Sequence, residues 1–98
     1  MTLAEFIASV GDPTPPPVSD PLRALWHDAR GDWAAAHEVA QDVHTQAGSW
    51  VHAYLHRKEG DQSNAAYWYR RAGRPVADGS LQAEWNAIAA TLLEDTHT

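Results

Sequence analysis

The chain of 98 residues carries 13 acidic side chains against seven Lys and Arg, a formal net charge of −6 at pH 7, and no cysteine. The length fits one domain, and the lack of cysteine excludes disulfides, thiolate metal ligands and a thiol nucleophile. The negative charge argues against extensive nucleic-acid binding, and no apolar run approaches the roughly 20 residues that span a bilayer. The N-terminus carries Glu5 but no Lys or Arg and does not resemble a secretion signal, so a cytoplasmic protein of bacterial type is expected.

The core is expected to combine alanine with large aromatic side chains. Leu, Ile, Val and Phe together number only 16, whereas there are 18 alanines, five tryptophans and three tyrosines. Alanine favours helix and allows helices to approach closely, while tryptophan and tyrosine bury large areas. No segment alternates with a period of two, so strands are not expected.

The first 19 residues predict a short helix followed by a proline-rich connection. Thr2 and Glu5 have the spacing of a capping box, which predicts a helix that ends near Gly11. Residues 12–19 contain four prolines, which cannot continue a helix. We expect this segment to run as an extended strap that spaces the first helix from the rest.

Residues 20–75 predict two pairs of helices. Asp20 followed by Pro21 is typical of a helix start, and this helix should end at Arg30. Asp32 begins a helix whose apolar positions continue to Ala47, and Gly48-Ser49 is expected to break it. Further helices should span 50–59 and 61–72. Residues 76–98 should hold a loop and a last helix, starting at Ser80 with Leu81, Trp85, Ile88 and Leu92 on one face, and then a tail.

The same turn occurs twice in this central region. Gly31-Asp32 and Gly60-Asp61 lie 29 residues apart, each with a glycine that can close one helix and an aspartate that can cap the next. With Ala36 and Ala65 behind them, these turns resemble tetratricopeptide-type αα-hairpin repeats, although the period is shorter than the usual 34. This resemblance implies one all-α domain of two antiparallel hairpins, with an N-terminal helix and a C-terminal capping helix. Residues 50–75 are also similar to a group of small microbial proteins of no assigned activity.

Four of the six histidines fall on two successive predicted helices. If these helices fold back about Gly48, positions whose numbers sum to 96 face each other, so that His44 faces His52 and His37 faces Glu59. Gln41 would then lie near His56. His52 and His56 are i, i+4 neighbours on one helical face. Three imidazoles and a carboxylate suit zinc or another divalent ion, which predicts a metal site of His44, His52, His56 and Glu59.

Two other interpretations of the histidines stay open. A histidine beside an apolar stripe often packs its ring and donates one hydrogen bond, so the cluster could simply link two helices. The histidines could also line a pocket for an organic ligand. If the protein is an enzyme, His52, His56 and Glu59 are the group that could perform acid–base or hydrolytic chemistry.

Residues 50–75 hold five basic side chains against two acidic ones, a local charge of +3 in an acidic chain. Arginines beside aromatic rings can bind carboxylates or phosphates, although Arg70 and Arg71 could instead pair with Glu38 or Asp42. The sequence therefore favours a small helical binding domain that takes a protein partner or a small anionic ligand, with a homodimer as a further expectation. The expected binding face comprises His37, Gln41, Trp50, His52, His56, Arg57, Tyr67, Arg70 and Arg71.

Overall fold

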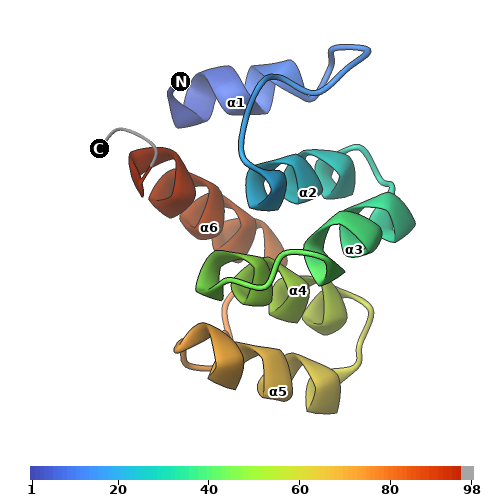
Figure 1. The fold of residues 1–98 in the computed structure, drawn as a ribbon, viewed down its shortest axis with the longest axis vertical. Coiled ribbons are helices and arrows are strands. Elements are labelled where there is room, and N and C mark those ends of the chain that lie inside the picture. Colours follow the sequence, from blue (N-terminus) through green and yellow to red (C-terminus); the bar gives the residue numbers. More distant parts are fainter. Residues whose placement is uncertain (96–98) are drawn as a thin grey trace.

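The protein is all-helical in the computed structural model, which describes residues 1–95 (Figure 1). This range contains six helices and no strand, as expected: α1 (Leu3–Ser9), α2 (Asp20–Ala29), α3 (Trp33–Gln41), α4 (Gln46–Lys58), α5 (Gln62–Ala72) and α6 (Leu81–Asp95). α4 is the central element, because it packs against α2, α3, α5 and α6. None of the described helices combines the length and the apolar character needed to cross a membrane. The end of the predicted tail, residues 96–98, lies outside the described residues.

Most helix starts follow the predicted caps. The Thr2 hydroxyl accepts from the Glu5 amide and the Glu5 carboxylate accepts from the Thr2 amide, which completes the expected capping box. Asp32 and Asp61 cap α3 and α5 as predicted. The start of α2 differs, because the N-cap is Ser19 and Asp20 already belongs to the helix.

The connection between α3 and α4 differs from the prediction. α3 ends at Gln41 instead of Ala47, and α4 begins at Gln46, four residues before the expected start. The Thr45 hydroxyl accepts from the Gly48 amide at 3.0 Å, so a threonine cap starts the helix here. Gly48 therefore lies inside the first turn of α4 and does not break a helix.

Gly48 is required by close packing. A Cβ at this position would lie 2.3 Å from the Val43 carbonyl oxygen and 2.7 Å from two Val43 side-chain atoms. We expect Gly48→Ala to destabilise the protein by about 1–3 kcal/mol, although alanine is the better helix former. Thermal unfolding followed by circular dichroism measures the effect. Gly79→Ala is the matched control, since a Cβ there meets no atom within 4 Å, and equal stability of the two variants would contradict this account.

The core contains the expected alanines and tryptophans together with more aliphatic side chains than the composition suggested. Trp26, Trp50 and Trp85 are buried, and so are seven alanines; the aliphatic members are Leu22, Leu25, Val51, Leu55, Ile88, Leu92 and Leu93. Trp85 donates from Nε1 to the Leu25 carbonyl at 3.0 Å, which ties α6 to α2. Trp26 also donates from Nε1, to the Ser9 carbonyl, so both indole N–H groups have a partner while the rings pack in the core.

The N-terminal helix joins this core and is not held apart from it. Phe6 is fully buried and stacks on Trp85 with ring centroids 5.7 Å apart. Trp26 donates from Nε1 to the Ser9 carbonyl, and Arg30 donates to the carbonyls of Val10 and Asp12. Residues 12–19 form neither helix nor strand, as expected, but they return the chain from α1 to α2 and do not act as a spacer.

Two buried acidic side chains link the helices, each held by a tyrosine and a base. Asp28 on α2 accepts from the Tyr54 hydroxyl at 3.1 Å and from Lys58 Nζ at 2.9 Å. Burial and the neighbouring carboxylate raise the pKa of the Tyr54 phenol above its ordinary value, and the same holds for Tyr69 beside Glu84 in the second group, described below. The tyrosines therefore remain hydrogen-bond donors throughout the physiological pH range.

The second group lies between α4, α5 and α6. Glu84 accepts from the Tyr69 hydroxyl at 2.5 Å and from Arg57 Nη1 at 2.9 Å, and Arg57 also donates to the Gly79 carbonyl. The Glu84 and Arg57 side chains are only 6% and 11% exposed. Because breaking a buried pair leaves an uncompensated charge, this group should contribute strongly to the fold.

Candidate metal centre

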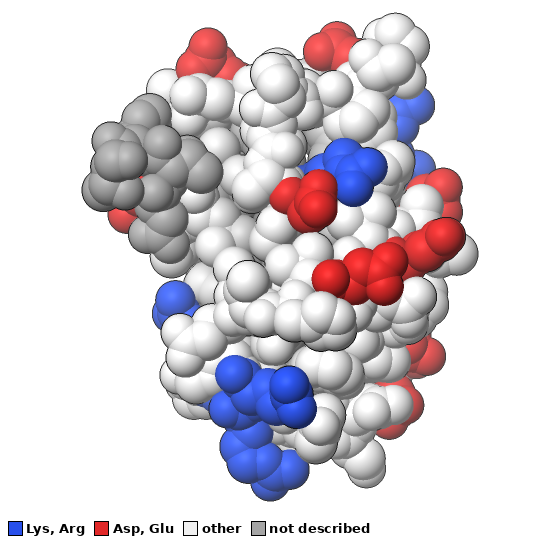
Figure 2. Space-filling view, in the orientation of Figure 1, with Lys and Arg blue, Asp and Glu red and all other residues white. Residues whose placement is uncertain are grey.

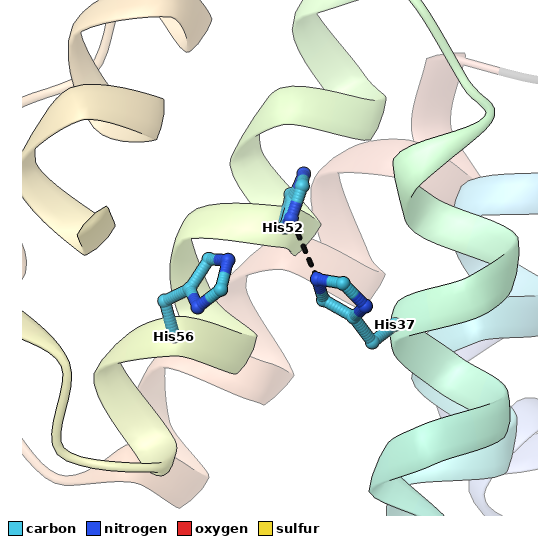
Figure 3. Close-up of side chains that lie close together, drawn as sticks. All are labelled: His37, His52 and His56. Carbon is cyan, nitrogen blue, oxygen red and sulfur yellow. Dashed lines mark hydrogen bonds between the residues drawn. The ribbon is translucent and has the colours of Figure 1, made fainter.

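Three histidine rings from two helices converge beside the core. His37 comes from α3, and His52 and His56 come from α4; their rings point toward one another (Figure 3). The ring centroids are separated by 4.7 Å (His37–His52), 5.2 Å (His37–His56) and 4.7 Å (His52–His56). Three ring nitrogens, one from each histidine, lie within 4.8 Å of one another. We refer to these residues as the three-histidine cluster.

Helix geometry accounts for two of the three positions. His52 and His56 are four residues apart on α4, so their rings stack along one face at an interplanar angle of 27°. Both are buried, with exposed fractions of 5% and 9%, whereas His37 is half-buried. The short connection between Gln41 and Gln46 brings α3 back along α4 and places His37 across from them.

The predicted pairing of the histidines was wrong. His37, and not His44, contacts His52, with 2.9 Å between their Nε2 atoms. His44 lies exposed in the connection after α3, and Gln41 is exposed at the end of that helix. The reason is the earlier turn: moving the reversal from Gly48 to residues 42–45 shifts the residue that faces His52 from position 44 to position 37, which is about two helical turns.

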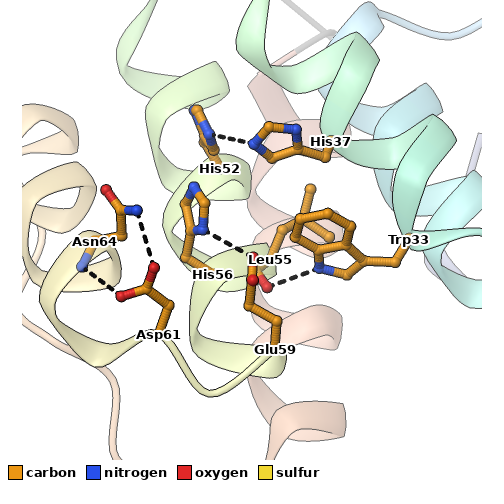
Figure 4. Close-up of polar contacts among 8 residues, drawn as sticks. All are labelled: Trp33, His37, His52, Leu55, His56, Glu59, Asp61 and Asn64. Carbon is orange, nitrogen blue, oxygen red and sulfur yellow. Dashed lines mark hydrogen bonds and ion pairs between the residues drawn. The ribbon is translucent and has the colours of Figure 1, made fainter.

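Glu59 contacts the three-histidine cluster through a hydrogen bond with His56. Nδ1 of His56 and Oε2 of Glu59 are 3.0 Å apart, so this carboxylate, expected opposite His37, instead fixes the His56 ring (Figure 4). With Nδ1 engaged, Nε2 of His56 is the nitrogen left for a ligand; it makes no hydrogen bond within the described residues. A carboxylate behind a histidine is the usual outer partner in metal sites, because it fixes the tautomer and the ring orientation.

The rings His37 and His52 are held in the neutral form. Burial lowers the pKa of His52 to about 4, with further contributions from His37 and His56. Burial, and then the neighbouring His56, also lowers the pKa of His37 below its ordinary value. Since only the neutral imidazole has a lone pair to donate, both residues are ready to bind a metal ion at neutral pH without losing a proton.

Two tryptophans enclose the cluster. Trp33 stacks on His37 with centroids 4.9 Å apart and an interplanar angle of 10°, and its Nε1 donates to the Leu55 carbonyl at 2.8 Å. Trp68 of α5 stacks on His52 with centroids 4.0 Å apart. These rings restrict the rotation of the histidines, so the cluster is preorganised. Neither tryptophan was among the predicted site residues, because their stacking on the histidines depends on contacts between helices.

The remaining residues of the expected binding face are distributed over several surfaces. Arg57 is engaged with Glu84 in the core, and Trp50 packs beneath Arg74, away from the cluster. Tyr67, Arg70 and Arg71 are exposed on α5. Two cavities of about 370 and 380 Å³ lie elsewhere, beside Tyr54 and beside Trp50, and no histidine lines either of them.

The chain matches no protein-family model, no curated protein and no solved structure. The chemistry of the site is therefore argued from its geometry. Tetrahedral zinc with Zn–N bonds of about 2.0–2.1 Å places its ligand nitrogens about 3.4 Å apart. The nitrogens of the cluster lie close to that spacing, with 2.9 Å between two Nε2 atoms and all three donors within 4.8 Å of one another.

The lowered pKa of His52 predicts a loss of stability in acid for the metal-free protein. Above pH 6.5, His52 is neutral in both folded and unfolded chains; between pH 6.5 and about 4 only the unfolded chain takes up the proton. The free energy of unfolding should fall by roughly 2–3 kcal/mol across this window because of His52. Urea titrations at several pH values measure it. His52→Gln should flatten this part of the profile. If its profile is no flatter than that of His44→Gln, the pKa of His52 is not lowered in the folded protein.

Proposed function

We propose that this is a small helical metal-binding protein that holds a divalent transition-metal ion of the zinc class through His37, His52 and His56. The observation that carries the proposal is the placement of three ring nitrogens, from two helices, within 4.8 Å of one another. Imidazole is a borderline ligand that suits zinc and its neighbours. A fourth position remains for water or for a ligand from a partner.

The hydrogen bonds favour this function over three structural histidines. A structural histidine usually donates to a carbonyl or a carboxylate, and within the described residues only His56 does so. His37 and His52 share one proton between two facing nitrogens, and Nε2 of His56 has no partner in this range. A bound ion would give these ring nitrogens a partner that the described residues do not supply.

Binding is favoured over hydrolysis as the role of the metal. Glu59, the carboxylate beside the cluster, is engaged with Nδ1 of His56, on the side of that ring away from the nitrogen left for the ion. A general base for a metal-bound water needs hydrogen-bond reach to that water. Glu59 is therefore better placed to orient a ligand than to accept the proton of the water.

Metal analysis of protein purified without an affinity tag tests the proposal. We expect close to one equivalent of zinc or a related metal in the parent protein, and its loss in His52→Ala/His56→Ala. His44→Ala is the matched control, since this exposed histidine lies outside the cluster and should leave the metal content unchanged. Folded, metal-free protein whose melting temperature is unmoved by added zinc or cobalt would refute the metal function.

We also infer that α2–α3 and α4–α5 are two αα-hairpin repeats of tetratricopeptide type. The support is a repeated turn. Gly31 and Gly60 have φ of 81° and 91°, and the amides of Asp32 and Asp61 donate to the carbonyls of His27 and His56 at 3.0 and 2.9 Å. Each aspartate then caps the next helix at its third residue, and Ala36 and Ala65 are both fully buried behind the turns. These equivalences all follow the 29-residue shift.

A further inference from the structure

Three exposed arginines near the end of α5 have no carboxylate partner in the part of the chain that the structure describes. Arg70, Arg71 and Arg74 form no ion pair within the described residues, so the pairing of Arg70 and Arg71 with Glu38 or Asp42, which the sequence left open, is not found. The other bases are engaged: Arg23 with Asp20, Arg57 with Glu84, Lys58 with Asp28, and Arg30 with two carbonyls. Unneutralised positive charge is thus concentrated at one end of a protein whose net charge is −6.

Aromatic rings hold two of these arginines in place. The Arg74 guanidinium lies 3.8 Å from the centroid of Trp50, and that of Arg71 lies 5.4 Å from Trp68 and 5.8 Å from Tyr67. Arg71 also donates to the Tyr67 hydroxyl at 3.2 Å. Such stacking fixes the plane of a guanidinium and leaves most of its donors available, which lowers the entropy cost of binding a carboxylate in bidentate fashion.

Trp50 and Arg74 line two hollows, and the walls of the larger one are mainly apolar. The larger, about 380 Å³, is lined in part by Pro75, Val76, Ala83 and Ala87, and Val76 is 53% exposed. The smaller, about 110 Å³, includes Ala47, Ala72 and Leu92. Apolar side chains of a ligand could therefore be buried directly beside the arginines.

The helix dipole explains only part of this surface. Arg70 and Arg71 lie in the last turn of α5, where positive charge is favourable. Arg74 lies beyond the end of the helix, after Gly73 in the left-handed conformation. The helix dipole therefore does not explain why its guanidinium stacks on Trp50. Tryptophan, tyrosine and arginine together are also the residues most enriched at the energetic centres of protein interfaces.

We propose that Arg70, Arg71 and Arg74, with Tyr67, Trp68 and Trp50, form a docking surface for an acidic segment of a partner protein. Its carboxylates would pair with the arginines, and an apolar side chain would enter a hollow beside Trp50. Figure 2 shows that basic side chains gather over the end of α5, whereas acidic side chains lie over α2 and α3 on the same face. That acidic region repels a long polyanion, so the surface fits a short acidic peptide better than a nucleic acid.

The test uses a fluorescein-labelled peptide of alternating glutamate and leucine, followed by fluorescence anisotropy with the full chain. We expect binding that weakens as salt is raised and that falls at least tenfold in Arg70→Gln/Arg71→Gln/Arg74→Gln. Arg70→Gln alone, at a position without partners in the described residues, should fall severalfold without affecting folding. Arg23→Gln is the matched control for a surface arginine and should bind as the parent does.

Three results would overturn the proposal: equal binding of a lysine–leucine peptide, an unchanged affinity in the triple variant, and stronger binding of an oligodeoxythymidine, which would indicate a nucleic-acid surface. The experiment is repeated with His52→Ala/His56→Ala. Retained peptide binding there would show that the docking surface is independent of the proposed metal centre.

Discussion

Replacing Glu84 with glutamine is expected to lower the free energy of unfolding by about 3–5 kcal/mol. The Glu84 side chain is 6% exposed, and its two oxygens accept from Arg57 and Tyr69. The substitution keeps the volume and one acceptor but leaves the Arg57 guanidinium, itself 11% exposed, without a counter-charge. The loss is a large fraction of the stability of a small domain, and urea unfolding followed by tryptophan fluorescence measures it.

Two further variants show how much of this loss of stability depends on the burial of the pair and how much on the unpaired charge of Arg57. Asp20→Asn removes the partner of Arg23, but both side chains are more than 40% exposed, so we expect a cost below about 1 kcal/mol. Adding Arg57→Met to Glu84→Gln removes the stranded charge and should recover part of the loss. If Glu84→Gln costs no more than Asp20→Asn, the buried pair does not hold α6 to α4 as described.

Replacing His37 with alanine is expected to weaken zinc binding by more than about a hundredfold, which corresponds to roughly 2.7 kcal/mol. The variant removes one of three nitrogens in a cluster whose donors lie within 4.8 Å. Loss of an outer partner alone typically costs tenfold to a hundredfold, so loss of a direct ligand should exceed this. Competition titration against a chromophoric chelator measures the affinity at pH 7.

His37 also distinguishes the observed arrangement from the one predicted by the sequence. In that prediction His44 is the ligand and His37 faces Glu59; in the structure His44 is exposed and outside the cluster. His44→Ala should therefore bind zinc as the parent does. If His44→Ala lost the metal while His37→Ala kept it, the turn between α3 and α4 would have to be placed elsewhere.

Much of the fold follows from local signals in the sequence. The capping box at Thr2, the aspartate caps at Asp32 and Asp61, and the glycines with positive φ all act within a few residues, so they identify helix ends directly. The apolar face of α6 was predicted for the same reason: Trp85, Ile88 and Leu92 are all buried.

The site was predicted only in part, because it depends on one turn. His52 and His56 were identified from their helical spacing, which no tertiary contact alters. His37 was paired with the wrong partner because Gly48 was interpreted as a breaker, whereas its lack of a Cβ allows the Val43 backbone to approach. The hydroxyl of Thr45 was the signal that could have located the start of α4. The roles of Trp33 and Trp68 depend on contacts between helices, which spacing along one helix does not contain.

X-ray absorption of the zinc-loaded protein tests the central claim most directly, because it reports the ligands of the ion itself. We predict three imidazole nitrogens at about 2.0 Å with one further light atom, and two imidazoles after His37→Ala. Parent protein that shows zinc bound by oxygen ligands alone, or spectra that are identical for the parent and His37→Ala, would contradict a metal centre at the three-histidine cluster.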